Sequence, residues 1–138
     1  MFNWLKKSQV VKSLGQRGEE AAQAHYKAEG FSLLEANYFN KKGKRLGEVD
    51  FIVKNKTAIV FVEVKTRTQE KGRFGSGAEA VNGFKQIKLL KAVKTYLGGH
   101  PEFTNLQPRI DVCEVVMGEL DKVPKHVKIL VNAVDDWN

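Results

Sequence analysis

The stretch of sequence that decides the fold is Ala58-Ile59-Val60-Phe61-Val62-Glu63-Val64-Lys65. It is apolar on both alternating faces, which is typical of a central β-strand that is covered on both sides. Glu63 and Lys65 interrupt the run near its end. Because side chains two residues apart on a strand point to the same face, both charges fall on one face of the sheet. Charges in such a position need a partner or a ligand.

A second strand is expected directly before this one, from Glu48 to Lys54, joined to it by a short polar turn. By the same alternation Glu48 and Asp50 share one face, and the opposite face is apolar: Val49, Phe51 and Val53. In an antiparallel pair joined in this way, Asp50 lies near the Glu63 end. Two carboxylates and a lysine are therefore predicted to converge at one end of the sheet.

The remaining elements give the order α, β, β, β, α, β, β. They are a helix over Ser13 to Glu29, a strand over Phe31 to Tyr38, a helix over Gly83 to Leu97 with Asn82 as N-cap, and strands over Arg109 to Met117 and His126 to Val131. This order predicts an α/β (α+β) fold with a central mixed sheet of about four to five strands, flanked by helices. We expect one domain over residues 1–138, with residues 1–12 as a flexible extension and a core over about 13–131.

Charge and cysteine content restrict the function further. The 138 residues carry 23 Lys and Arg against 16 Asp and Glu, a formal net charge of +7, which favours an anionic partner such as nucleic acid. The single cysteine, Cys113, has no internal disulfide partner, and no Cys/His cluster has zinc spacing. No stretch has the length of a signal peptide or a membrane span, so we expect a cytoplasmic protein without a membrane partner.

The predicted carboxylates suit a hard divalent cation. Mg²⁺ is commonly held by one or two carboxylates, with waters and substrate phosphate completing its octahedron, and Asp50 and Glu63 form such a pair. The backbone carbonyl of Val64 is a further candidate ligand. A bound Mg²⁺ or Mn²⁺ would activate a water and neutralise the scissile phosphate, while Lys65 would orient that water or stabilise developing charge. This chemistry is phosphodiester hydrolysis.

The order of these residues resembles the PD-(D/E)XK nuclease motif. In Gly47-Glu48-Val49-Asp50 the usual proline is replaced by Val49, and Glu63-Val64-Lys65 matches the second half of the motif. With Gly15-Gln16-Arg17-Gly18-Glu19 and Ala78-Glu79-Ala80-Val81, the chain resembles the YraN family of uncharacterised bacterial proteins from about Leu14 to Val116. That family is similar to archaeal Holliday junction resolvases, so the resemblance implies a restriction endonuclease-like fold.

The resemblance also implies two supporting residues. A helical Glu joins the two acids and the lysine in the resolvases, and Glu19 is the matching position, both as a catalytic acid and as a further metal ligand. Helical spacing agrees, because Glu19 lies on the arc of Ala22 and Tyr26, whereas Glu20 is turned about 100° away into water. In several nuclease families a polar residue of the second helix faces the metal, and Gln86 is the candidate here. Gln86 is equally explained as a polar side chain at a helix start.

Basic residues around these segments are candidates for contacts with backbone phosphates. They are Arg17, Lys41, Lys42, Lys44, Arg45, Arg67, Arg73 and Lys85. Charges of this kind are equally common on solvated loops. The sequence also leaves the role of Asp111 open. Its side chain either lies near the site or pairs with a basic neighbour such as Arg109.

Three hypotheses follow. The first is a Mg²⁺- or Mn²⁺-dependent nuclease for branched or structured DNA, with Asp50, Glu63, Glu19 and Lys65 as catalytic residues and Glu48 in support. DNA is favoured over RNA, and resolvase-like work on a symmetric junction implies a homodimer. The second is a nucleic-acid-binding or adaptor protein that keeps the nuclease fold without turnover. The third is a closed ion-pair network with a structural role only.

Overall fold

The computed structural model describes residues 12–36, 49–68 and 83–134, with the side chains of 83–85 left undescribed. The helices are α2 (Leu14–Ala28), α3 (Gly83–Gly98) and the short 3-10 helix η3 (Pro101–Phe103). The strands are β1 (Ser32–Ala36), β2 (Phe51–Lys54), β3 (Ala58–Arg67), β4 (Gln107–Val116) and β5 (His126–Leu130).

A five-stranded mixed sheet forms the centre of the molecule, in the order β1-β2-β3-β4-β5. The pairs β1–β2, β2–β3 and β4–β5 are antiparallel, whereas β3–β4 is parallel. A parallel pair needs a crossover connection, and α3 supplies it between β3 and β4. The expected fold class and order of elements are therefore confirmed, and the arrangement is consistent with a restriction endonuclease-like fold.

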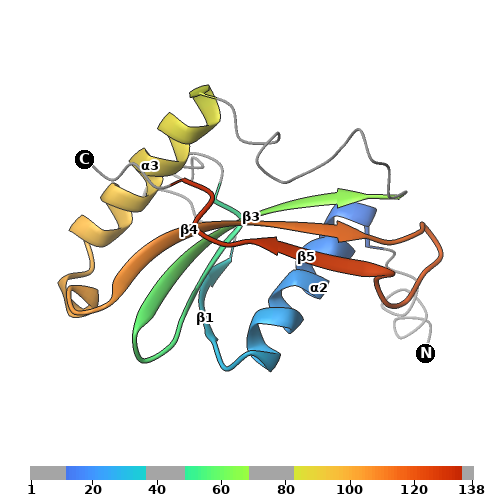
Figure 1. Cartoon of the computed structure of the whole chain (residues 1–138), viewed down its shortest axis with the longest axis horizontal. Helices are drawn as coiled ribbons and strands as arrows, with labels where there is room; N and C mark the ends of the chain where they lie inside the picture. The colour runs from blue at the N-terminus through green and yellow to red at the C-terminus, as the bar shows by residue number, and fades with distance from the viewer. Residues whose placement is uncertain (1–11, 37–48, 69–82, 135–138) are drawn as a thin grey trace, which may run out of the picture.

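The two long helices cover opposite faces of the sheet (Figure 1). On one face α3 packs its apolar stripe against alternate residues of the central strands: Leu89, Ala92, Val93 and Tyr96 against Ile52, Ile59, Phe61, Ile110 and Val112. On the other face α2 packs against the intervening residues: Ala22 and Tyr26 against Phe51, Val53, Val60, Val62, Cys113 and Val115. Both faces of β3 are thus buried, which explains its continuous apolar run.

Local signals in the sequence fix the ends of α2. The Ser13 side chain accepts a hydrogen bond from the Gln16 N–H, and the Gln16 side chain accepts one from the Ser13 N–H, which completes a capping box. After the helix, Gly30 adopts φ +96°, a backbone conformation that glycine tolerates best. The helix therefore begins and ends within one residue of the predicted span.

One prediction about β2 is wrong. Val49 was expected to share a face with Phe51 and Val53, yet it belongs to the core cluster of Ile52, on the α3 face. Phe51 is registered opposite Val62, but the Asp50 N–H also donates to the Val62 carbonyl at 3.0 Å, so the pairing slips by one residue at Asp50. That slip turns Val49 to the other face. The predicted ends at Tyr38, Glu48 and Asn82, and the extension before Lys12, lie outside the described residues.

Candidate active site

The candidate site lies at the C-terminal end of β3, where, among the described residues, β3 continues past the start of β2. The described part of β2 starts opposite Val62, whereas β3 continues to Arg67 in register with β4. Beyond Val62, the β2 side of β3 is therefore an edge as far as the described chain shows. An edge of this kind presents backbone groups that a ligand or a side chain can reach.

Asp50 occupies this edge. Its carboxylate Oδ2 accepts a hydrogen bond from the Val64 N–H at 2.8 Å, and its own N–H donates to the Val62 carbonyl. The two bonds hold the side chain beside the backbone that carries Glu63, so the expected placement of Asp50 at the Glu63 end is confirmed. Asp50 is half-buried, which leaves the position accessible to solvent.

Glu63 and Lys65 lie on the α3 face of the sheet. Phe61 belongs to the core cluster under α3 and Val64 packs against the opposite cluster, so alternation along the strand assigns residues 63 and 65 to the α3 face. The Glu63 side chain is buried at 4% exposure, whereas Lys65 is half-buried. Glu63 and Lys65 therefore share one face of the sheet, as the alternation along the strand predicted.

Glu114 is a further charged residue of this face that was not predicted from the sequence. It is registered opposite Lys65 on β4, is 7% exposed, and forms an ion pair with Arg67 at 3.6 Å between Oε2 and Nε. The sequence marks Glu114 in the same way as Glu63, because Glu114 is a single carboxylate within an apolar run, from Val112 to Val116. Arg67, predicted to contact phosphate, is therefore engaged with a buried carboxylate.

Glu19 reaches the same end of the sheet from the α2 side. Its neighbour Gly18 is buried directly against Thr66, because a Cβ at residue 18 would lie 1.9 Å from Thr66 Oγ1. Glu19 is half-buried, whereas Glu20 is exposed and pairs with Lys12 at 2.6 Å, as the helical spacing predicted. Since Glu63 lies on the opposite face, an ion shared by both acids would have to sit at the β3 edge.

The first turn of α3 is directed towards this end of the sheet (Figure 1). The C-terminal part of α3 is fixed at the other end, where the Tyr96 ring packs against Phe61 and against Phe103 of η3. The helix therefore runs antiparallel to β3, and Gln86, which is half-buried, lies in its first turn. The first turn of α3, which includes Gln86, is therefore the part of the helix nearer to this end of the sheet.

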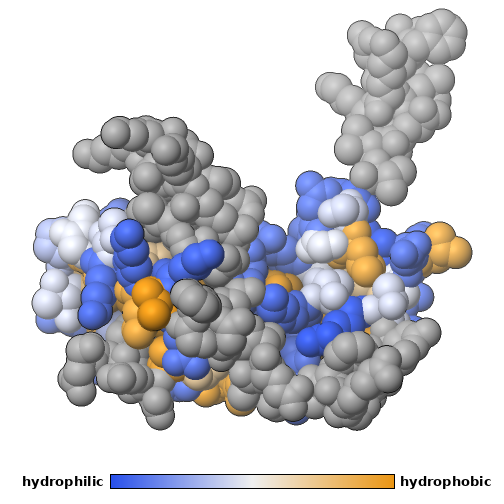
Figure 2. Space-filling view, turned by 90° about the horizontal axis from the view of Figure 1, so that it is seen from above, coloured by the Kyte–Doolittle hydropathy of each residue, from blue (hydrophilic) through white to orange (hydrophobic). Residues whose placement is uncertain are grey.

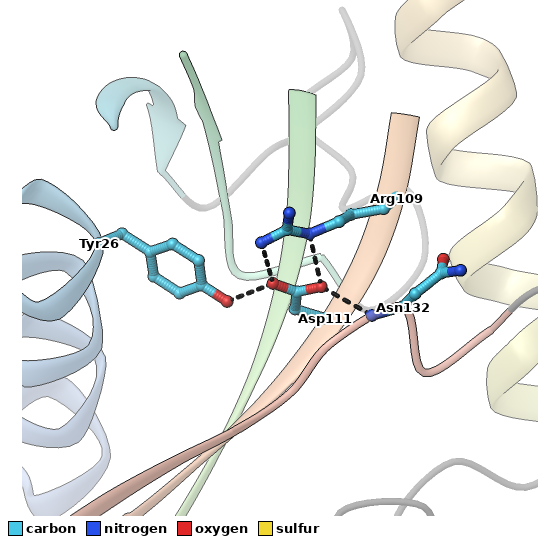
Figure 3. Close-up of polar contacts among 4 residues, drawn as sticks. All are labelled: Tyr26, Arg109, Asp111 and Asn132. Atoms are coloured by element: carbon cyan, nitrogen blue, oxygen red, sulfur yellow. Dashed lines mark hydrogen bonds and ion pairs between the residues drawn. The ribbon is translucent and has the colours of Figure 1, made fainter. Parts of the chain in front are cut away.

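Asp111 belongs to a separate cluster on the α2 face (Figure 3). Its fully buried carboxylate accepts hydrogen bonds from Tyr26 Oη at 2.7 Å, from Arg109 Nε and Nη2 at 3.0 and 3.1 Å, and from the Asn132 N–H at 2.9 Å. Burial, followed by the neighbouring carboxylate, raises the pKa of Tyr26 well above its ordinary value, so Tyr26 stays a donor. The alternative left open by the sequence is thus resolved in favour of pairing with Arg109.

Arg17, predicted to bind nucleic acid, is engaged inside the protein. Its guanidinium donates to three carbonyl oxygens of the loop after β4: Glu119 at 2.6 Å, Gly118 at 2.8 Å and Asp121 at 2.7 Å. These bonds favour a structural role over a phosphate contact. The other predicted residues Glu48, Lys41, Lys42, Lys44, Arg45 and Arg73 lie outside the described residues, as does the side chain of Lys85.

A divalent metal ion requires a minimum number of carboxylate ligands from the protein. Within residues 12–36, 49–68 and 83–134, no three His, Cys, Asp or Glu side chains form a group that could hold a metal. Mg²⁺ and its analogues need fewer protein ligands, since one or two carboxylates with waters and phosphate oxygens suffice. Asp50, whose carboxylate accepts from the Val64 N–H, and Glu63, the residue before Val64, are the two acids to which this requirement applies.

Sequence comparisons place the chain among related bacterial proteins. The family described as "Uncharacterised protein family UPF0102" matches residues 18–115. A UPF0102 protein of Caldanaerobacter subterraneus subsp. tengcongensis is 37% identical over 122 residues, covering 88% of this chain and 94% of that protein. Relatives from Alkaliphilus metalliredigens and Clostridium acetobutylicum are 38% and 39% identical, covering 83% and 77% of this chain and 94% and 81% of those proteins. Neither of the described long helices has the length and apolar character needed to cross a membrane.

Proposed function

The chain belongs to the uncharacterised protein family UPF0102, and from its site we propose that it is a metal-dependent nuclease that hydrolyses phosphodiester bonds. The observation that carries the proposal is the bond from Val64 N–H to Asp50 Oδ2, which holds one carboxylate beside the strand that carries a buried second one, Glu63. A divalent ion bound at this end of the sheet would draw its protein ligands from these two acids, since one or two carboxylates are its usual minimal set.

Each side chain has a separate role in the proposed reaction. Asp50 and Glu63 would hold Mg²⁺ or Mn²⁺, with the Val64 carbonyl and Glu19 as further candidate oxygen ligands. When bound, the ion supplies a water of lowered pKa and charge neutralisation at the scissile phosphate. Lys65 orients the attacking water or stabilises charge that develops on the phosphate.

The net charge of +7 supports a polyanionic substrate, and we propose DNA in preference to RNA. Branched or otherwise structured DNA is the proposed form, with a homodimer where the junction is symmetric. The proposed compartment is the cytoplasm. The alternative function is an adaptor that binds nucleic acid through the same fold and does not cut it.

The test is a cleavage assay on linear, nicked, flapped and four-way DNA and on RNA, with Mg²⁺, with Mn²⁺ and with a chelator. The wild type is expected to cut only with metal, and Lys65→Met to lower the rate by about 10²- to 10³-fold while binding is kept. Lys54→Met, at the opposite end of β2, is the matched control and should cut normally. Binding without cleavage under every condition would establish the adaptor, and failure to bind any nucleic acid would reject both functions.

A further inference from the structure

The loop between β4 and β5, residues 117–125, presents apolar side chains to solvent at one end of the molecule. Leu120 is 96% exposed and Val123 is 72% exposed. In Figure 2 an apolar tip, coloured orange, lies at the right-hand end of the molecule, where Figure 1 places this loop. Leu120 and Val123, three residues apart on one loop, are the two most exposed of the large hydrophobic side chains in the described part of the chain, and they give the loop an apolar tip.

This loop is held in one conformation by the protein. The Gly118 N–H donates to Asp121 Oδ2 at 2.6 Å, and the Asp121 N–H donates back to the Gly118 carbonyl at 3.1 Å. Arg17 of α2 binds the carbonyls of Gly118, Glu119 and Asp121. Leu120 therefore stands on a turn whose backbone is ordered before any partner arrives, which lowers the entropy cost of binding.

The loop also lies close to the proposed active site. It continues directly from β4, and the Met117 N–H donates to the Arg67 carbonyl at 3.0 Å, two residues beyond Lys65. Glu114 is registered opposite Lys65, and Leu120 follows Glu114 by six positions, so the backbone of the tip is within roughly 25 Å of that of Lys65. A DNA duplex advances about 3.4 Å per base pair, so one bound duplex can contact both places.

The charges beside the tip identify the kind of partner. Exposed lysines follow Leu120 at three positions: Lys122, Lys125 and Lys128. Asp121, one of the two acids in the loop, bonds to the Gly118 N–H, and Glu119 remains as an exposed acid. An apolar side chain flanked by cations is the arrangement with which proteins insert between base steps and hold the adjoining phosphates. A protein partner would not require the row of lysines.

We propose that the β4–β5 loop is a wedge for nucleic acid, in which Leu120 inserts between stacked bases and Lys122 and Lys125 contact the flanking phosphates. This inference rests on the proposed nuclease function and specifies how that site selects its substrate. Inserting the side chain is easiest where stacking is already interrupted, as at a junction, flap or nick. The wedge would thus place branched or interrupted DNA at Lys65 in preference to an intact duplex.

The test uses DNA that carries 2-aminopurine beside a four-way junction, with the chelator present so that no cutting occurs. Unstacking raises 2-aminopurine fluorescence, and anisotropy of a second label measures binding in the same sample. The wild type is expected to raise the fluorescence, and Leu120→Ala to abolish the rise and weaken junction binding roughly tenfold, as expected for one apolar side chain. Leu33→Ala, at a 51% exposed leucine of β1, is the matched control and should behave as wild type.

A second variant, Lys122→Ala with Lys125→Ala, should weaken binding and reduce its salt dependence while leaving the fluorescence of the saturated complex raised. The wedge proposal is overturned if Leu120→Ala raises the 2-aminopurine fluorescence as much as the wild type does. It is also overturned if the substitution changes only the self-association of the protein, measured by sedimentation. Cleavage assayed separately with Mn²⁺ distinguishes the two proposals, because a nuclease without a wedge would still cut. An unchanged melting temperature of Leu120→Ala excludes misfolding as the cause of any loss.

Discussion

Replacing Asp111 by alanine should cost more stability than replacing any exposed carboxylate. The side chain is fully buried and accepts hydrogen bonds from Tyr26, from two nitrogens of Arg109 and from the Asn132 N–H. Removing it leaves a hydroxyl, a guanidinium and a backbone N–H without their acceptor. Breaking one side of a buried ion pair typically costs about 3–5 kcal/mol.

The size of the effect can be stated as a change in melting temperature. Unfolding entropy of about 2.1 cal/mol/K per residue, taken over 138 residues, makes 1 kcal/mol equivalent to about 3–4 °C. Asp111→Ala should therefore lower the melting temperature by roughly 10–17 °C. Tyr26→Phe removes only one hydrogen bond to the carboxylate and should cost about 1.5–3 kcal/mol.

Urea unfolding followed by far-UV circular dichroism is the suitable assay, because the signal follows the loss of both the helices and the sheet. The double variant Tyr26→Phe with Asp111→Ala should cost less than the sum of the single variants, since both act on one bond. Glu119→Gln, at an exposed carboxylate, is the control and should change stability little. A loss below about 1 kcal/mol for Asp111→Ala, or strict additivity with Tyr26→Phe, would refute the view that this cluster stabilises the fold.

Three further predictions concern packing, pH and the ion pair of the site. Gly18→Ala should cost about 1–3 kcal/mol, because its Cβ would overlap Thr66 atoms at 1.9–2.8 Å, and Thr66→Gly should relieve the overlap in urea titrations of the double variant. Burial raises the pKa of Cys113 from 9.0 to about 12, so the folded state holds a proton that the unfolded state has lost in this window. This contribution to stability is complete below pH 9 and falls by up to about 1.4 kcal/mol per pH unit as pH rises to 12. The free energy of unfolding, measured by urea titration at pH 8 to 11, should therefore fall more steeply with pH in the wild type than in Cys113→Ala. The same pH dependence in both proteins would contradict the raised pKa of Cys113. Glu114→Gln should cost about 1–3 kcal/mol by leaving Arg67 without its ion pair, and a double-mutant cycle with Arg67→Met should then show coupling.

The sequence predicted the features that depend on local periodicity. The apolar run before Glu63 identified β3 as central, and the alternation within it placed Glu63 and Lys65 on one face. The helical arc of α2 distinguished Glu19 from Glu20 correctly. These features follow from the spacing of residues along a single element, which a sequence displays directly.

The errors concern relations between elements. Val49 was placed on the wrong face because a one-residue slip in strand pairing at Asp50 leaves no mark in the sequence. Arg17 was grouped with phosphate contacts because its three carbonyl partners lie about a hundred residues further along the chain. Glu114 was not selected because its register opposite Lys65 depends on a parallel pairing whose offset cannot be counted from the strand alone.

The parallel pairing of β3 with β4 also sets the time at which the site can form during synthesis. Ala58 is registered opposite Gln107, so the two halves of this pairing are separated by about fifty residues of chain that include α3. When Glu63 and Lys65 of a growing chain have just emerged from the ribosome, β4, which borders them, and α3, which covers their face, have not yet emerged. Such distant pairing is slow to form and leaves apolar strands exposed meanwhile. Chains truncated before residue 107 should therefore lack a complete sheet and be prone to aggregate, which light scattering of the purified fragments would measure.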